Sequence, residues 1–198
     1  MKNIKETIDV VINELNELDD KREQVIRLTR RLNRVSGSGI SHLVRNKDYS
    51  EYLQNGRKLL GELSELMQDL APATSWNLTG SGVEEYTEFE LLHAIVNSDN
   101  LPSSTELAVP SWIWITAIGD CIGELRRLML AALIDENLEN ARIFLTKIQE
   151  LYDAIIGIDF SKSLVPNLRR KIDIARTLID KCESDFANAM INKRTKSS

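Results

Sequence analysis

Glycine and proline are scarce in this chain, which has 9 Gly and 4 Pro among its 198 residues. Domains built from many short strands and tight turns contain more of both, so the composition disfavours a β-sandwich or a β-barrel. Hydrophobic residues make up 42% of the chain and charged residues 28%, a balance that is typical of a folded protein and argues against disorder. We therefore predict one all-α domain over residues 1–191, followed by a flexible polar tail at 192–198.

Cysteine and histidine are scarcer still, with two of each. Cys121 and Cys182 are not part of a CxxC motif and cannot build a disulfide framework, so we expect a cytoplasmic protein in a reducing compartment. His42 and His93 leave little room for chemistry that needs several histidines.

Long apolar runs are also missing. The most apolar stretch, from Ala108 to Ile118, is followed closely by Asp120 and Glu124, so it is too short to cross a bilayer. The N-terminus lacks the apolar middle of a signal peptide. We expect no membrane partner.

Apolar residues at helical spacing are abundant. The first stripe runs from Ile4 to Leu32 and predicts a helix over about residues 3–35, which Ser36-Gly37-Ser38-Gly39 should end. Further periodic stretches predict six or seven helices in all and no strand, with a polar loop at 73–81. The remaining predicted helices cover about residues 53–70, 83–96, 110–134, 136–156 and 167–190.

The charge of the chain is segregated. Its formal net charge is -5, which taken alone argues weakly against a nucleic-acid partner. The segment from Lys21 to Arg34, however, has six basic residues and one acidic residue, so it carries +5 and the remainder carries -10. A second basic cluster lies at 169–176. Two such clusters favour binding to a phosphate backbone, although a solvated helix face with intrahelical ion pairs explains the same pattern.

Two carboxylates on the predicted third helix share one face. Glu85 and Glu88 are three residues apart, and the same face continues to Leu92 and Ile95. The apolar continuation places both glutamates towards the interior side of the helix. Two ordinary surface glutamates are the alternative interpretation.

A second carboxylate pair lies in the most apolar predicted helix. Asp120 and Glu124 are four residues apart and stack on one face. Burying them is costly unless a cation compensates, and that cation is either Arg126 or Arg127, or a divalent metal ion. Four carboxylates from two helices suit Mg²⁺ or Mn²⁺, which prefer oxygen ligands. With basic helices nearby, this pattern is typical of a metal-dependent nuclease.

A di-iron site is the competing interpretation of these acids. Glu90 and His93 form an ExxH motif, but a di-iron bundle needs a second one. The other histidine is His42, and Gly39 stands where its glutamate would have to be. We therefore reject the di-iron site and expect His93 to be a helix-surface or interface residue.

Four stretches of the sequence resemble the translin family, and its catalytic, Trax-like branch in an archaeal-type homologue more than translin itself. The first is the arginine-rich segment around Arg27 and Arg30, followed by Ser41-His42. The second is EYTE at 85–88, similar to the family's E-[FY]-x-E, and the third is GDCIGELRR at 119–127, similar to D-x-x-G-E-L-x-R. The fourth is LRRKIDIAR at 168–176, similar to the family's C-terminal helix. The second and third together are the most specific.

The resemblance implies an all-α protomer of about seven helices that assembles into a closed, barrel-like homo-octamer. It implies binding to RNA, with single-stranded DNA and RNA–DNA hybrids as further partners, and Mg²⁺-dependent endoribonuclease activity. The catalytic and metal-binding acids of the family correspond to Glu85, Glu88, Asp120 and Glu124. The residues expected to grip the nucleic-acid backbone are Arg27, Arg30, Arg31, Arg34, Arg127 and Arg170.

Three hypotheses follow. The chain is a metal-dependent endoribonuclease, in which water activated by the metal attacks the phosphate and leaves 5′-phosphate and 3′-hydroxyl ends. In the second hypothesis, the chain is a non-catalytic, translin-type binder of single-stranded nucleic acid. In the third, it is a purely structural helical assembly whose carboxylates are satisfied by arginines.

Overall fold

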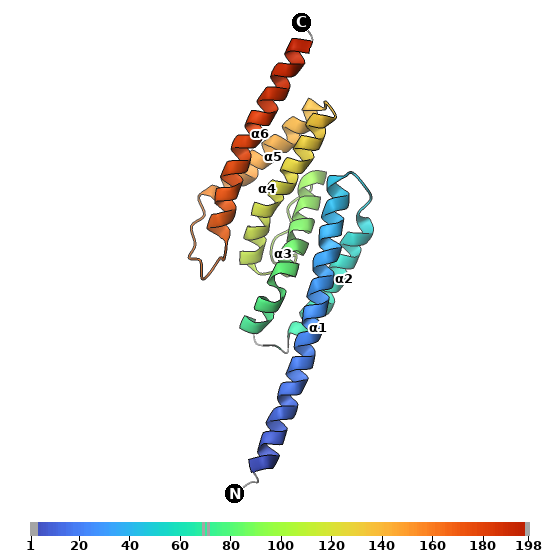
Figure 1. Ribbon diagram of the computed structural model, residues 1–198, viewed down its shortest axis with the longest axis vertical. Coiled ribbons are helices and arrows are strands. Elements are labelled where there is room, and N and C mark those ends of the chain that lie inside the picture. Colours follow the sequence, from blue (N-terminus) through green and yellow to red (C-terminus); the bar gives the residue numbers. More distant parts are fainter. Residues whose placement is uncertain (1–3, 69, 71, 197–198) are drawn as a thin grey trace.

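The protein is all-helical in the part of the chain that the structure, a computed structural model, describes, which is residues 4–68, 70 and 72–196 (Figure 1). This confirms the predicted fold class. Six helices are present in the described residues, one fewer than the resemblance implied. They are α1 (Ile4–Val44), α2 (Ser50–Met67), α3 (Pro72–Asn97), α4 (Ser111–Ile134), α5 (Leu138–Ile156) and α6 (Leu168–Lys196).

Helix α1 does not end at Ser36-Gly37-Ser38-Gly39, so this predicted break is wrong. The helix continues without interruption to Val44. The small residues serve close packing instead, because a β-carbon at Gly39 would lie 2.2 Å from the ring of Phe89 on α3. The free energy that α1 gains from packing on α3 outweighs the low helix propensity of two glycines, about 1 kcal/mol each.

The predicted polar loop at 73–81 is also wrong, because these residues belong to α3. Pro72 stands in the first turn, where proline is compatible with a helix. Gly82 brings α3 against α1: a β-carbon there would lie 2.8 Å from the backbone oxygen of Thr29. As at Gly39, the glycine permits a close approach between two helices.

The C-terminal boundary at residue 191 is not the end of a helix. Helix α6 continues from Leu168 to Lys196. The last two residues of the predicted tail, 197–198, lie outside the described residues. Mobility of this tail therefore stays a prediction.

The six helices form two groups of three that meet where α3 packs against α4. Helices α1, α2 and α3 enclose one part of the core, around Leu32, Leu63 and Val83. Helices α4, α5 and α6 enclose the other with residues of α3 such as Phe89. Figure 1 shows α3 and α4 in the middle of the molecule, with α5 and α6 on one side of this pair and α1 and α2 on the other. Carboxylates on the facing sides of α3 and α4 are therefore drawn together in the middle of the molecule.

The N-terminal part of α1 projects beyond the rest of the molecule (Figure 1). One side of this projection is apolar and exposed, and we call it the apolar stripe. It consists of Ile4, Ile8, Val11, Ile12, Leu15 and Leu18, each at least 45% exposed. The projection is amphipathic, and in the described residues no helix has an apolar stretch that could cross a membrane.

Candidate functional site

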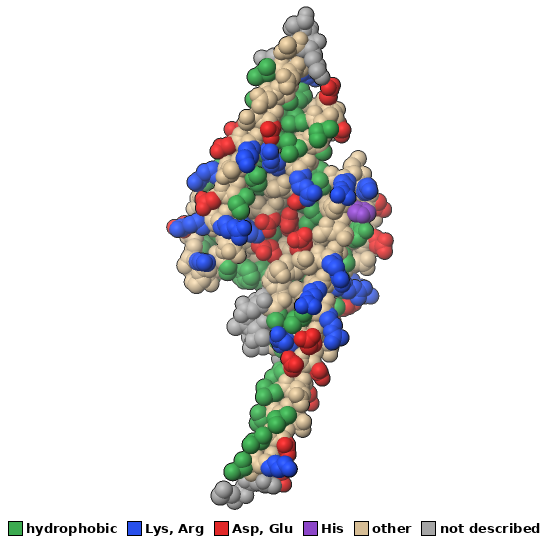
Figure 2. Space-filling view, viewed as in Figure 1, with side chains coloured by type: hydrophobic (Ala, Val, Ile, Leu, Met, Phe, Trp, Pro, Cys, Tyr) green, Lys and Arg blue, Asp and Glu red, His purple; other side chains and the backbone are tan. Residues whose placement is uncertain are grey.

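The four predicted carboxylates lie together on the facing sides of two helices. Glu85 and Glu88 come from α3, and Asp120 and Glu124 come from α4; we call these four residues the acidic cluster. Burial raises the pKa of Glu85, and repulsion from Asp120 and Glu124 raises it further. Figure 2 shows acidic side chains gathered near the middle of one face, with lysine and arginine side chains on both sides.

Glu88 is the most deeply buried member of the acidic cluster. It is 8% exposed, and its carboxyl group has no hydrogen bond or ion pair with any described residue. Burial, together with repulsion from Asp120, Glu85 and Glu124, raises the pKa of Glu88 to about 9. An unpartnered carboxylate in this position is unfavourable unless it is protonated or a cation joins it.

Lys171 brings a cation into the site from α6. Its ammonium group donates hydrogen bonds to Asp120 and to Glu84, a fifth carboxylate, whose Oε1 lies 2.5 Å from Nζ. Burial lowers the pKa of Lys171, but these two hydrogen bonds outweigh it and the net shift is upward. The pKa of Asp120 is raised because burial outweighs the stabilisation by Lys171. The sequence placed Lys171 in a basic cluster, and no sequence pattern signalled that it would contact the acids.

Arg127 compensates Glu124, the second acid of α4. It is one of the two arginines, Arg126 and Arg127, that the sequence offered as compensating cations. Its Nη1 donates to both carboxylate oxygens of Glu124, at 3.1 and 2.9 Å. Arg126 instead pairs with Asp185 of α6, at 2.9 Å. Arg127 therefore lies at the edge of the acidic cluster, paired with Glu124 but 56% exposed, and its predicted contact with nucleic acid stays a prediction.

The predicted arginines of α1 lie on one exposed face of that helix. At 3.6 residues per turn, they and Arg45, the first residue after α1, fall within about 100° of one another, opposite the side that α1 buries. None of their guanidinium groups has a hydrogen bond or ion pair with a described residue. We call this surface the arginine face; it consists of Arg27, Arg30, Arg31, Arg34 and Arg45.

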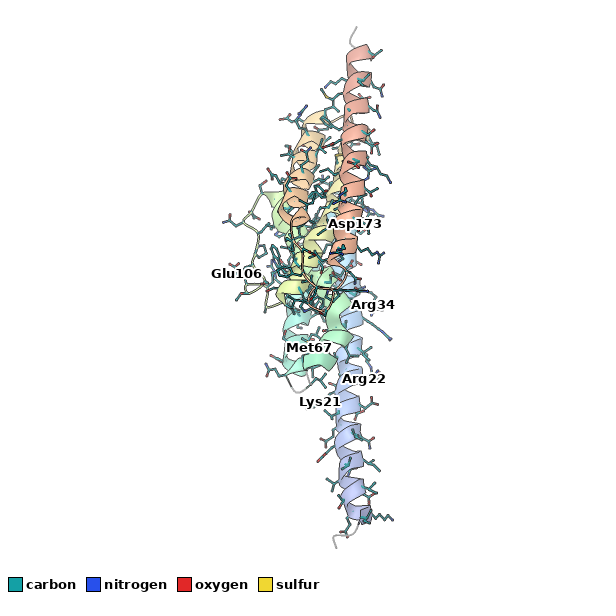
Figure 3. All side chains as sticks on the ribbon, turned by 90° about the vertical axis from the view of Figure 1, so that its left-hand side faces the viewer. Lys21, Arg22, Arg34, Met67, Glu106 and Asp173 are labelled. Atoms are coloured by element: carbon teal, nitrogen blue, oxygen red, sulfur yellow. The ribbon has the colours of Figure 1, made fainter. Side chains whose placement is uncertain are left out.

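A groove of 430 Å³ joins the arginine face to the acidic cluster. Arg34 and Arg45 line it on the α1 side, and Glu85 lines it on the α3 side. Figure 3 shows Arg34 on the same edge of the molecule as α6. Sequence reasoning missed Arg45 because the helix was expected to end before it; with α1 continuous, its spacing from Arg34 and Ser41 would have revealed it.

Arg170 is placed apart from these residues. It lines a different groove, of 1140 Å³, between α6 and the loop that precedes it. Its neighbour Arg169 pairs with Asp159 of that loop, at 3.0 Å. No contact in the described residues joins Arg170 to the acidic cluster, so a role in gripping the same ligand stays a prediction.

Both side chains of the ExxH motif have hydrogen-bond partners within the protein. Glu90, 3% exposed, is held by Arg57 through two hydrogen bonds of 2.7 and 2.8 Å and by the hydroxyl of Tyr86. His93 shares hydrogen bonds with Tyr49 and Asn97. Glu90 and His93 thus have separate structural partners, and the rejection of a di-iron site still rests on the missing second ExxH motif.

The acidic cluster fits a divalent cation by its chemistry. Its donors are carboxylate oxygens, which Mg²⁺ and Mn²⁺ prefer. In addition, no cationic side chain of the described residues forms an ion pair with Glu88. In the described residues, no three acidic, histidine or cysteine side chains are spaced to hold a metal ion as they stand. Lys171 and Arg127 each hold one of the carboxylates, Asp120 and Glu124 respectively.

No protein-family model matches the chain. An uncharacterized protein of Methanocaldococcus jannaschii is 29% identical over 190 residues, covering 93% of this chain and 83% of its own. Among solved structures, the crystal structure of AfC3PO gives a TM-score of 0.87 at 23% identity and covers 94% of this chain and 98% of its own. The chain has the C3PO fold.

Two further structures agree with this assignment of the fold. AfC3PO in complex with duplex RNA gives a TM-score of 0.85 at 21% identity, over 94% of this chain and 97% of that one. Apo-NeC3PO gives 0.83 at 24% identity, over 92% and 96%. The C3PO fold thus extends over nearly the whole chain.

Proposed function

We propose that the chain is a translin-family protein of the Trax-like, archaeal type, and that it is an endoribonuclease that depends on Mg²⁺ or Mn²⁺. The observation that carries this proposal is the buried, unpartnered Glu88 among three other carboxylates, next to a groove lined by arginines. The translin-like motifs fall on these same residues. The C3PO fold and the duplex RNA bound by one C3PO structure give further support.

Glu85, Glu88, Asp120 and Glu124 are the residues that would hold the cation. A divalent cation bound there would supply an activated water and would neutralise charge on the phosphate undergoing hydrolysis. In the metal-free protein, the high pKa of Glu88 keeps its carboxyl group protonated at neutral pH. Binding of the cation therefore requires Glu88 to release its proton, which makes cation affinity depend on pH.

The arginine face would position the RNA. Arg34 and Arg45 line the groove that reaches Glu85, so a phosphate held by these guanidinium groups lies beside the acidic cluster. Contacts to phosphate position a strand without selecting its sequence. RNA is the proposed substrate, and single-stranded DNA or an RNA–DNA hybrid offers the same backbone charge.

Self-association follows from the apolar stripe. Large exposed apolar surfaces mark sites where proteins associate, and this one lies on a single side of the projecting helix. We propose a homo-oligomer, an octamer by the resemblance to translin. A cytoplasmic location is consistent with two free, buried cysteines.

A non-catalytic nucleic-acid binder is the second candidate. It is favoured by the ion pairs that already compensate Asp120 and Glu124, through Lys171 and Arg127. In that protein the acids would be structural and the arginine face would carry the function. It predicts binding to RNA that weakens with salt, without cleavage.

Cleavage of labelled RNA decides between the two. Single-stranded and duplex RNA are incubated with Mg²⁺, with Mn²⁺ and with EDTA, using wild-type protein and the variants Glu88→Gln and Asp120→Asn. The nuclease proposal expects cleavage that EDTA abolishes and that each variant lowers about 100-fold or more, the size expected when a group in the chemistry is removed.

The matched control is Glu150→Gln, an exposed carboxylate on α5. It should cleave as the wild type does. Cleavage that persists in EDTA or in both cluster variants would contradict the nuclease proposal. Binding without cleavage under any condition would select the second candidate.

A further inference from the structure

Lys171 is the only residue of α6 with a hydrogen bond or ion pair to the carboxylates of α3 and α4 in the described chain. Its Nζ donates to Glu84 of α3, at 2.5 Å, and to Asp120 of α4. The same ammonium group lies 3.3 Å from the backbone oxygen of Thr116. Three acceptors surround a side chain that is only 15% exposed. A buried ammonium group with its hydrogen bonds satisfied in this way is held in place rather than left to solvent.

The backbone of α4 is shaped to admit this lysine. Gly119 precedes Asp120, and a β-carbon at Gly119 would lie 3.1 Å from Cβ of Lys171 and 3.5 Å from Cδ. The stem of the lysine therefore crosses α4 where the helix has no side chain. Gly123, one turn later, has no atom within 4 Å of where its β-carbon would be, so the close approach is confined to the path of Lys171.

The position of this ammonium group overlaps with the proposed cation site. Asp120 is both a proposed metal ligand and the partner of Lys171. A carboxylate oxygen that accepts a hydrogen bond from an ammonium group is a weaker donor to a metal ion, and the two cations repel each other at this distance. Lys171 occupies Oδ2 of Asp120, so a divalent cation bound to either oxygen of this carboxylate would lie next to the ammonium group and be repelled by it.

We infer that Lys171 is the internal counter-cation of the acidic cluster, and that a divalent cation must displace its ammonium group from Asp120 in order to bind. This inference rests on the proposed function only in that it assumes the acidic cluster is the metal site. Lys171 acts here as a positioning residue: it holds Glu84 and Asp120 together across α3, α4 and α6 in the metal-free protein, and it lowers the affinity of the cluster for metal.

The first test is Mn²⁺ binding by calorimetry without RNA, on wild type, Lys171→Met and Lys171→Arg. Removing the competing charge should tighten Mn²⁺ binding by about tenfold in Lys171→Met, within the range of coupling between two sites. Lys171→Arg keeps the charge and should stay close to wild type. An affinity in Lys171→Met that is unchanged or weaker would overturn the inference.

Arg126→Met is the matched control. Arg126 is also a partly buried cation that joins α4 to α6, but it pairs with Asp185 outside the acidic cluster. Its loss removes a similar ion pair between the same two helices, so it should lower stability without tightening Mn²⁺ binding. Equal tightening in both variants would overturn the inference. The effect would then come from the loss of any positive charge and not from the loss of a competitor for Asp120.

A second measurement uses the wild-type protein, so it does not depend on the folding of a variant. Lysines are acetylated with an activated ester and each site is quantified by mass spectrometry. Saturating Mn²⁺ should increase the rate at Lys171 several-fold by releasing it from Asp120. Lys147, which donates to the backbone oxygen of Ile95 away from the acids, should not change. A rate at Lys171 that Mn²⁺ leaves unchanged or lowers would overturn the inference.

These readouts separate failure of the inference from failure of the proposed function. Mn²⁺ binding and acetylation need no RNA, so a chain that releases Lys171 on binding Mn²⁺ but cleaves no RNA supports the inference and contradicts the nuclease proposal. RNA cleavage without release of Lys171 on Mn²⁺ binding would support the nuclease proposal and contradict the inference. Absence of Mn²⁺ binding in every variant overturns both.

Discussion

Gly39 of α1 lies directly against Phe89 of α3, so closely that a β-carbon at position 39 would be 2.2 Å from Cζ of the ring. Half a turn earlier, a β-carbon at Gly37 would lie 3.0 Å from Oε1 of Glu85. These approaches bring the arginine face of α1 next to the carboxylates of α3. The candidate site is therefore built on the packing of two helices at small residues.

Gly39→Ala should destabilise the protein. Phe89 is fully buried, so its ring cannot move into solvent and α1 must shift instead, at a cost of about 1–3 kcal/mol. Chemical denaturation of the metal-free protein measures this as a lower free energy of unfolding. The control is Gly61→Ala on α2, which meets no atom within 4 Å and should stabilise by up to about 1 kcal/mol through helix propensity. Equal effects at both positions would contradict the packing role of Gly39.

Much of the candidate site could be predicted because helical spacing alone assigns residues to a face. Glu85 with Glu88, and Asp120 with Glu124, are each one turn apart, and apolar neighbours indicated that both pairs face inward. The structure brings the two pairs together because α3 and α4 are adjacent in sequence and pack against each other. Local periodicity and a single connecting loop, at residues 98–110, were sufficient.

What could not be predicted depends on contacts between distant segments. The continuation of α1 through two glycines is stabilised by Phe89, 50 residues away, and without it Arg45 could not be assigned to the arginine face. Lys171 reaches Asp120 across 51 residues because Gly119 leaves room for its stem. Single-sequence propensity favours a helix end at Ser-Gly-Ser-Gly, and tertiary packing overrides it.

Glu88→Gln should stabilise the metal-free protein at neutral and alkaline pH. The folded-state pKa of Glu88 is about 9, against 4.5 for the free side chain, so the unfolded chain loses this proton first. The free energy of unfolding therefore falls as pH rises from about 4.5 to 9. Glutamine removes that dependence, with a gain of about 1–3 kcal/mol at pH 8 and none near pH 4. Urea denaturation at both pH values, in EDTA, measures the difference.

Glu90→Gln provides the contrasting case, two residues along the same helix. Glu90 is also buried, 3% exposed against 8% for Glu88, but it is paired with Arg57 through two hydrogen bonds, so the substitution should destabilise the protein by about 1–3 kcal/mol at pH 8. The two substitutions are thus expected to change the free energy of unfolding in opposite directions at pH 8. Destabilisation by Glu88→Gln at pH 8 would show that its carboxyl group has a stabilising partner.

Replacing Arg34 and Arg45 by glutamine should weaken RNA binding and reduce its dependence on salt. Each lost phosphate contact lowers the slope of log K against log salt concentration by about 0.7 for a single strand. Fluorescence anisotropy with labelled RNA, in EDTA and at several salt concentrations, measures both quantities. Lys58→Gln, on α2 and beside Glu62, is the control and should keep the wild-type slope. An unchanged slope in the double variant would place the RNA elsewhere.

Substitutions in the apolar stripe should reduce the size of the particle. Ile8 and Leu15 are 52% and 59% exposed on the projecting part of α1, and association would remove both from water at a gain of about 1.5–3 kcal/mol for each side chain fully buried. Ile8→Gln with Leu15→Gln should therefore shift the mass measured by light scattering towards the protomer. Ile134→Gln is the control, because Ile134 is a single exposed residue at the end of α4, 82% exposed, and its replacement should leave the mass unchanged. A wild-type protein that is monomeric at every concentration would contradict association through this stripe.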